Sequence, residues 1–145
     1  MNETTLTIVG NVVTDITGTS TRTGIETASF RLASTTRRYD RGISQWVDGD
    51  TSYVKVVCWR RLARHVVESL AKGDPVVVVG RLRVREWQSD DGRRGVVVEI
   101  DASHVGHDLS RGVTRFTRPP RPAEVADGAV GEGSVEVRET KDEAA

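Results

Sequence analysis

The 145-residue sequence contains a single cysteine, Cys58, and therefore cannot form a disulfide within the chain. It does not open with a positively charged segment followed by a long apolar run, as a secretory signal would. It also lacks the run of about 18 consecutive apolar residues that a membrane span requires. We therefore expect a protein of the reducing cytoplasm that is neither exported nor inserted into a membrane.

The sequence also lacks the residue combinations on which catalysis and metal binding usually depend. His104 and His107 form an isolated His-x-x-His without a second ligand pair at a useful spacing, which favours a surface or turn position over a metal site. Cys58 alternates with Val54 and Val56, a pattern that indicates an inert thiol on the core side of a strand. No glycine-rich phosphate loop is followed by a lysine. We predict a protein that is not an enzyme and that binds no metal or cofactor.

Net charge is absent as well, because 21 basic and 21 acidic side chains cancel. The balance hides an asymmetry along the chain. Residues 1–121 carry 19 basic and 14 acidic side chains, whereas residues 122–145 carry 2 basic and 7 acidic ones. The first part of the chain is therefore the part that favours anionic partners.

The C-terminal residues 122–145 contain no Leu, Ile, Phe, Tyr or Trp. Such a segment cannot bury enough apolar surface to offset an ordering entropy of roughly 1 to 2 kcal/mol per residue. Residues 111–121 hold four arginines, no acid and the pair Pro119-Pro120, a composition typical of a stiff basic linker. We expect a folded domain over residues 1–110, followed by a disordered linker and acidic tail over residues 111–145.

Apolar residues alternate with a period of two through most of the expected domain. This alternation predicts five strands: one through Leu6–Val12, one that begins near Ile25, one over Ser52–Trp59, one from Pro75 to Trp87 and one through Val96–Ile100. A period of four in Leu62, Val66 and Leu70 predicts one short amphipathic helix before the fourth strand. Three strands, a helix and two strands form the element order of the OB-fold, a five-stranded Greek-key barrel. Small barrels of other topologies give a similar pattern; we predict the OB-fold, an all-β fold with one short helix.

Two of the predicted strands combine cationic and aromatic side chains on the faces that point away from the core. These side chains are Tyr53, Lys55 and Trp59 on the third strand and Arg81, Arg83, Arg85 and Trp87 on the fourth. Cations attract phosphates and flat rings stack on unpaired bases, so the combination is typical of a sheet that binds single strands without reading their sequence. In an OB barrel, we expect the two faces to be adjacent. A further cationic and aromatic cluster falls in the loop expected before the third strand: Arg37, Arg38, Tyr39, Arg41 and Trp46.

The same residues also have structural interpretations. An arginine row on an exposed strand can protect a sheet edge. A tryptophan at a strand-to-helix junction, such as Trp59, can be half-buried packing, and Tyr53 fits packing as well as stacking. Two functional hypotheses follow: a protein that binds single-stranded DNA, and an OB-fold scaffold that binds a protein partner through its exposed sheet. The row that joins three arginines to Trp87 favours DNA.

Several blocks of the sequence, in order, resemble the bacterial single-stranded DNA-binding proteins over residues 4–108. These blocks are Val9-Gly10-Asn11, Ala28–Ala33, Val56–Ala63, and Gly73 through Val79–Leu82 to Trp87. The resemblance implies an OB-fold that binds single-stranded DNA without strict sequence preference, in replication, recombination or repair. It further implies a homotetramer around which the strand wraps. By motif position it implies stacking roles for Tyr53, Trp59 and Trp87, and for Tyr39 in the loop after the second strand.

The C-terminus departs from this resemblance. Family members that recruit replication and repair proteins end in an acidic tip closed by an Asp-Ile-Pro-Phe-like sequence, whereas this chain ends in Thr-Lys-Asp-Glu-Ala-Ala. The departure argues against docking of partners through the tail and suggests a specialised, actinobacterial-type paralogue. We expect the protein in the cytoplasm, associated with the nucleoid. The predicted DNA-binding residues are Arg37, Arg38, Tyr39, Tyr53, Lys55, Trp59, Arg81, Arg83, Arg85 and Trp87.

Overall fold

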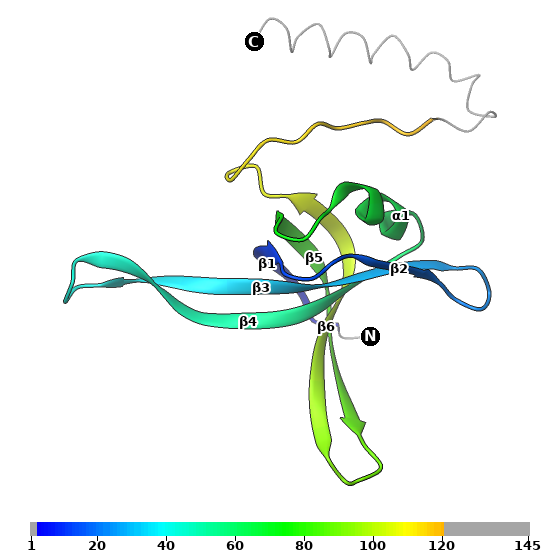
Figure 1. Ribbon diagram of the computed structural model, residues 1–145, viewed down its shortest axis with the longest axis horizontal. Coiled ribbons are helices and arrows are strands. Elements are labelled where there is room, and N and C mark those ends of the chain that lie inside the picture. The colour runs from blue at the N-terminus through cyan, green and yellow to red at the C-terminus, as the bar shows by residue number, and fades with distance from the viewer. Residues whose placement is uncertain (1–2, 121–145) are drawn as a thin grey trace, which may run out of the picture. The chain divides into compact units, whose positions relative to one another are not determined.

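Alternating apolar residues form most of the strands in the computed structural model, which describes residues 3–120 (Figure 1). The elements in chain order are β1 (Thr5–Val12), β2 (Thr17–Ser20), β3 (Glu26–Asp40), β4 (Gln45–Trp59), α1 (Arg60–Ser69), β5 (Pro75–Gln88) and β6 (Arg94–His107). The predicted all-β class with one short helix is confirmed. The additional strand is β2, whose four exposed residues carry no apolar alternation that could have revealed it.

The strands are ordered β1-β5-β6-β4-β3-β2, and a further pairing between β1 and β3 closes five of them into a barrel. Residues Asn11 and Val12 make this closure, while the rest of β1 pairs with β5. The short strand β2 lies beside the first residues of β3, outside the closed barrel. Strands β4 and β6 pair in parallel, and the other pairs are antiparallel. This is the predicted five-stranded OB barrel.

The inward faces of the barrel strands and one face of α1 form the core. Its buried residues are Val12, Ala28, Phe30, Leu32, Val54, Val56, Cys58, Ala63, Val66, Leu70, Val76, Val78 and Ile100. Full burial of a valine or leucine side chain contributes roughly 1.5 to 3 kcal/mol, so this apolar set is the main source of stability. The predicted inward position of Cys58 is confirmed. Burial, together with the nearby Asp101 carboxylate, raises the pKa of its thiol to about 12.

Closure of the barrel requires glycine at position 10, where β1 passes close to β3. A Cβ atom on Gly10 would overlap the carbonyl oxygen of Ala33. Gly80 has the same role on β5, where a Cβ atom would overlap the carbonyl oxygen of Asp101 on β6. The register of β5 and β6 shifts at this position, between Val79 and Gly80.

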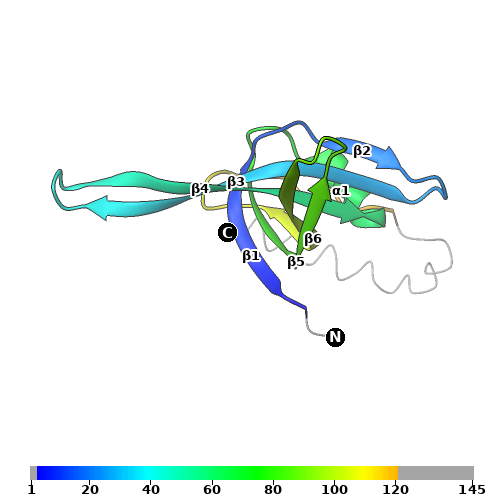
Figure 2. The ribbon, with the colours of Figure 1, turned by 90° about the horizontal axis from the view of Figure 1, so that it is seen from below.

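Two long hairpins, β3–β4 and β5–β6, project from the barrel in different directions, as Figure 2 shows from a second side. The predicted loop before the third strand is wrong, because β3 continues to Asp40 and β4 begins at Gln45. Most residues of this ribbon are exposed, so it lacks the apolar alternation that marks a strand in the sequence. Cross-strand contacts stabilise it instead, among them a 2.8 Å hydrogen bond between the hydroxyls of Thr35 and Thr51.

Strand β6 ends at His107, and residues 112–120 have no regular secondary structure. The first compact unit of the chain extends to Thr114. The domain boundary near residue 110 stays a prediction, and the predicted acidic tail over residues 122–145 lies outside the described residues. Within residues 3–120, no helix is long and apolar enough to cross a membrane.

Candidate nucleic-acid interface

One side of the barrel presents a continuous surface across β3, β4, β6 and β5. Residues that pair across strands share a face of the sheet, and the register places Arg31 beside Lys55, Lys55 beside Glu99, and Glu99 beside Arg83. We call this surface the outer face. It consists of Arg31 on β3, Tyr53, Lys55 and Trp59 on β4, Glu99 and Asp101 on β6, and Arg81, Arg83, Arg85 and Trp87 on β5. The structure therefore brings seven of the ten predicted binding residues onto one face.

The expected adjacency of the two cationic strands is wrong, because β6 lies between β4 and β5. This intervening strand contributes Glu99 and Asp101, which sequence reasoning had not selected. Their signal was present, since both alternate with the inward-facing Val98 and Ile100 and must point outward. Their neighbours could be read only from the strand order.

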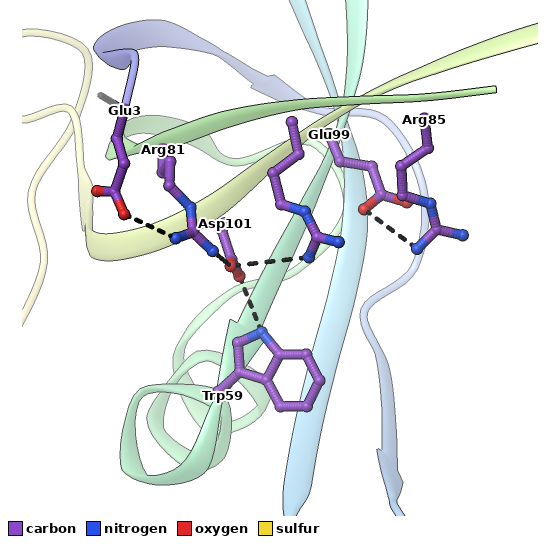
Figure 3. Close-up of polar contacts among 7 residues, drawn as sticks. Glu3, Trp59, Arg81, Arg85, Glu99 and Asp101 are labelled. Atoms are coloured by element: carbon purple, nitrogen blue, oxygen red, sulfur yellow. Dashed lines mark hydrogen bonds and ion pairs between the residues drawn. The ribbon is translucent and has the colours of Figure 1, made fainter. Parts of the chain in front are cut away.

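The arginine row of β5 is paired with carboxylates (Figure 3). Arg81 donates through Nη1 to Oε2 of Glu3 at 3.1 Å and through Nη2 to Oδ2 of Asp101 at 2.8 Å. Arg83 lies 3.9 Å from Asp101, and Arg85 lies 3.9 Å from Glu99. The hydrogen bonds to Glu3 and Asp101 raise the pKa of Arg81 above its ordinary value.

The two carboxylates of β6 are less exposed than the β5 arginines that lie beside them. The side chain of Glu99 is 6% exposed and that of Asp101 is 19% exposed. A carboxylate removed from water needs cationic or hydrogen-bonded partners, and the β5 arginines supply them. Each guanidinium has five N–H donors, so the pairing leaves donors available but offsets much of the row's positive charge.

The cations of β3 and β4 have different surroundings. Among residues 3–120, Arg31 and Lys55 form no ion pair. The guanidinium of Arg31 lies 5.9 Å from the centroid of the Tyr53 ring, which is within cation–π range. The tyrosine itself is 56% exposed. Arg31 is a candidate that the sequence-based selection missed, although it alternates with the inward-facing Phe30 and Leu32.

Trp59 ends β4 at the junction with α1, and its ring is partly exposed. Its indole Nε1 donates to Oδ1 of Asp101 at 2.8 Å (Figure 3). The next residue, Arg60, has a φ of 58°, in the left-handed region, so the backbone turns sharply into the helix. A shallow cavity of about 330 Å³ lies beside the tryptophan and is lined by residues that include Glu3, Arg81 and Asp101.

Trp87 lies near the end of β5, where it pairs with Gly95 of β6. A Cβ atom on Gly95 would overlap the indole ring, so the ring covers the glycine across the hairpin. Because Gly95 has no side chain, the Trp87 ring fits over it, and Trp87 remains 46% exposed. An aromatic ring that packs against the β5–β6 hairpin on one side and is open to solvent on the other is suited to stacking.

The remaining predicted residues, Arg37, Arg38 and Tyr39, lie near the end of β3. Figure 1 shows this end of the β3–β4 ribbon projecting from the barrel. Tyr39 and Trp46 form an edge-to-face pair with ring centroids 5.5 Å apart. Arg37 lies 3.4 Å from Asp48, so its charge is partly offset. The register places Arg38 on the opposite face of the ribbon from Tyr39. The predicted cluster is therefore divided between two faces of a projecting hairpin.

The two histidines of the His-x-x-His pattern have separate surroundings. His107 contacts Asp74, with 3.0 Å between Nε2 and Oδ2, and this hydrogen bond lowers the pKa of the Asp74 carboxyl. His104 is exposed and contacts the hydroxyl of Ser103. Within residues 3–120, no group of three or more His, Cys, Asp and Glu side chains is arranged to hold a metal ion.

Comparisons with known proteins agree with this architecture. Residues 1–108 match the single-strand binding protein family. Single-stranded DNA-binding protein 2 of Streptomyces avermitilis is 48% identical over 119 residues, which are 82% of this chain and 74% of the relative.

Two solved structures are also similar. The small single-stranded DNA-binding protein from Streptomyces coelicolor has a TM-score of 0.70 at 44% identity, over 77% of this chain and 100% of that chain. The second single-stranded DNA-binding protein from Mycobacterium smegmatis has a TM-score of 0.61 at 38% identity, over 81% of this chain and 100% of that chain.

Proposed function

The chain belongs to the single-strand binding protein family, and from this premise we propose that it binds single-stranded DNA through its outer face without strict sequence preference. The observation that carries the proposal is the arrangement of Tyr53, Trp59 and Trp87 as exposed rings among cations on one face. It acts as a binding protein and not as an enzyme, in keeping with the family.

Base stacking supplies the first part of the affinity. Every base has a π-face, so stacking on Tyr53, Trp59 or Trp87 tolerates any sequence and contributes roughly 1 to 3 kcal/mol per base. Tyr53 and Trp59 lie on β4, and Trp87 lies on β5 of the same barrel. A strand that crosses the outer face can therefore place successive bases on fixed rings.

Phosphate contacts supply the second part. Lys55 and Arg31 bind phosphates without breaking an ion pair. The three β5 arginines, in contrast, bind phosphates in competition with the carboxylates beside them, which are Glu3, Asp101 and Glu99. Each phosphate neutralised on a single strand lowers the slope of log K against log salt by about 0.7. Binding therefore weakens as salt rises.

The β3–β4 ribbon extends this surface. We assign Arg37, Arg38 and Tyr39 to a second contact region, because the ribbon carries exposed cations and rings away from the barrel.

The protein acts as a homo-oligomer, which we assign as a tetramer wrapped by the DNA strand. Sedimentation equilibrium of the full chain is expected to give four times the 15.9 kDa mass of one chain, and a monomer at micromolar concentration would overturn the assignment.

Single strands arise in replication, recombination and repair, and we place the protein's work in these processes, in the cytoplasm and at the nucleoid. The absence of tail-mediated docking stays a prediction, because the residues concerned lie outside the described part of the chain.

The alternative function, a scaffold that binds a protein partner through the exposed sheet, has less support. The centres of protein interfaces are depleted in charged residues. The middle of the outer face instead holds Lys55, Glu99, Asp101 and Arg83 in neighbouring positions.

Titration of the intrinsic tryptophan fluorescence with oligothymidylate tests the proposal. We expect strong quenching by the single strand, little by duplex DNA of the same length, and weaker binding at higher salt. Equal binding of duplex and single strand, or binding that ignores salt, would refute it.

A further inference from the structure

Asp101 connects the candidate stacking ring Trp59 to the arginine row. Its Oδ1 accepts from the Trp59 indole at 2.8 Å, and its Oδ2 accepts from Arg81 at 2.8 Å (Figure 3). Arg81 is held in turn by Glu3 at 3.1 Å. The network thus runs from the start of the chain through β5 and β6 to the end of β4.

The network fixes the carboxylate on both of its oxygens. A carboxylate with only one partner can rotate and release it, whereas Arg81 and Trp59 occupy different oxygens of Asp101. Asp101 is only 19% exposed, so water competes weakly for these oxygens. The indole N–H is therefore directed at a fixed acceptor.

Trp59 needs such a fixed acceptor because of its place in the fold. It lies at the last position of β4, immediately before the sharp turn at Arg60, and 39% of it is exposed. A ring that is free to change rotamer loses conformational entropy when a base stacks on it. A ring whose N–H edge is already held by a hydrogen bond loses less conformational entropy when a base stacks on its face.

We propose that Asp101 is a positioning residue for DNA binding, which holds the Trp59 ring in its stacking orientation while Arg81 holds Asp101. The inference rests on the proposed function. It gives this carboxylate, an anion on a surface for a polyanion, a positive role in binding that its charge alone would not suggest.

Two effects of opposite sign must be separated. Removal of the Asp101 charge frees Arg81 and Arg83 for phosphates and should strengthen binding, whereas loss of the acceptor should weaken stacking on Trp59. A double-mutant cycle separates them, because the charge effect is the same with or without the indole N–H. The four proteins are the full-length wild type, D101A, W59F and the double variant, each titrated with oligothymidylate at fixed salt.

The affinity of D101A divided by that of the wild type should be about tenfold lower than the affinity of the double variant divided by that of W59F. In the W59F background, the same substitution should leave affinity unchanged or raise it. E3Q is the matched control, since it removes a charge from Arg81 without touching Trp59. Its effect on affinity should be the same in both backgrounds.

A spectroscopic readout tests the orientation directly and does not depend on DNA. In ¹⁵N-tryptophan-labelled protein, the Trp59 indole resonance, identified by its loss in W59F, should show slow exchange with water. D101A should shift this resonance and speed its exchange, and E3Q should leave both nearly unchanged.

Equal effects of D101A in the two backgrounds would overturn the inference, and so would an unchanged Trp59 resonance in D101A. Failure of wild-type protein to bind oligothymidylate would instead overturn the proposed function. If D101A does not fold, D101L replaces it in the cycle, because leucine has a similar size and accepts no hydrogen bond; the criterion of unequal effects is the same.

Discussion

Arg31 on β3 and Lys55 on β4 lie on the same face of the barrel as the β5 arginines but differ from them in their surroundings. Each of the three β5 arginines lies within 4 Å of a carboxylate of the same face or of Glu3, whereas Arg31 and Lys55 have no such partner among residues 3–120. A row of arginines is the more conspicuous feature of the sequence. The pairing shows that the less conspicuous cations are the ones directly available to phosphates.

Substitution of the aromatic rings should give the largest effect, and both β4 and β5 carry exposed rings. Y53A on β4 and W87A on β5 should each weaken oligothymidylate binding by roughly 1 to 3 kcal/mol, since each removes one stacking platform. Both changes are to exposed rings, so thermal unfolding should move little. Affinity that is unchanged within error in either variant would remove that ring from the site.

The cations should separate the two sides more sharply. K55A should reduce the steepness of the log K against log salt plot by about 0.7, the value for one phosphate contact. R83A should reduce it by less, because Arg83 already lies 3.9 Å from Asp101 and exchanges one anion for another. The test is a salt titration of both variants under the same conditions. A larger slope change in R83A than in K55A would invert the comparison.

Substitution of Glu99 tests whether the carboxylates of β6 limit phosphate binding by the β5 arginines. E99Q removes the carboxylate that lies 3.9 Å from Arg85, so Arg85 should become available to phosphate. We expect modestly tighter binding at low salt, a few-fold at most, and a steeper salt dependence. A matched substitution at Asp91, an exposed acid paired with Arg93 on the β5–β6 turn, is the control. Equal effects of E99Q and D91N would show that only net charge matters.

The contact between His107 and Asp74 lies outside the outer face and should give the smallest effect of the four comparisons. The hydrogen bond from His107 lowers the pKa of Asp74, so the pair stabilises the fold at pH values above the carboxyl's unfolded-state pKa of about 3.9. This contribution is lost as the pH falls through the lowered native pKa. D74N should therefore unfold at a slightly lower temperature than the wild type at neutral pH. The unfolding temperatures of the two proteins should converge as the pH is lowered.

The salt dependence of DNA binding should not change in D74N, because neither partner belongs to the outer face. Unfolding curves that stay equally separated from neutral to acidic pH would show that the Asp74 pair does not supply the difference.

Much of the barrel could be predicted from the sequence because period-two alternation fixes the face to which a strand residue points. The inward positions of Val54, Val56 and Cys58 and the outward exposure of Tyr53 follow directly from it. The β3–β4 ribbon could not be predicted in this way, since it has no buried face. Its hydrogen bonds and ring pair form between residues that are only found opposite each other once the turn is placed.

The surroundings of the cations could not be predicted either. Alternation places Glu99 and Asp101 outward, but it does not say which strands lie beside β6. The parallel pairing of β4 with β6 joins residues that are 44 positions apart in the sequence, as in the pair Val57 and Asp101. No local signal in the sequence specifies such a pairing, so the ion pairs of the outer face became visible only in the fold.

Photo-cross-linking tests the central claim, that the outer face holds the single strand, most directly. Oligothymidylate with 5-iododeoxyuridine at single positions would be bound to the full-length protein, irradiated and mapped by mass spectrometry, because this base cross-links to aromatic rings stacked against it. We expect cross-links at Tyr53, Trp59 and Trp87, and we expect salt and unlabelled competitor strand to reduce them. Cross-links that avoid all three rings, in protein that binds the oligonucleotide, would contradict it.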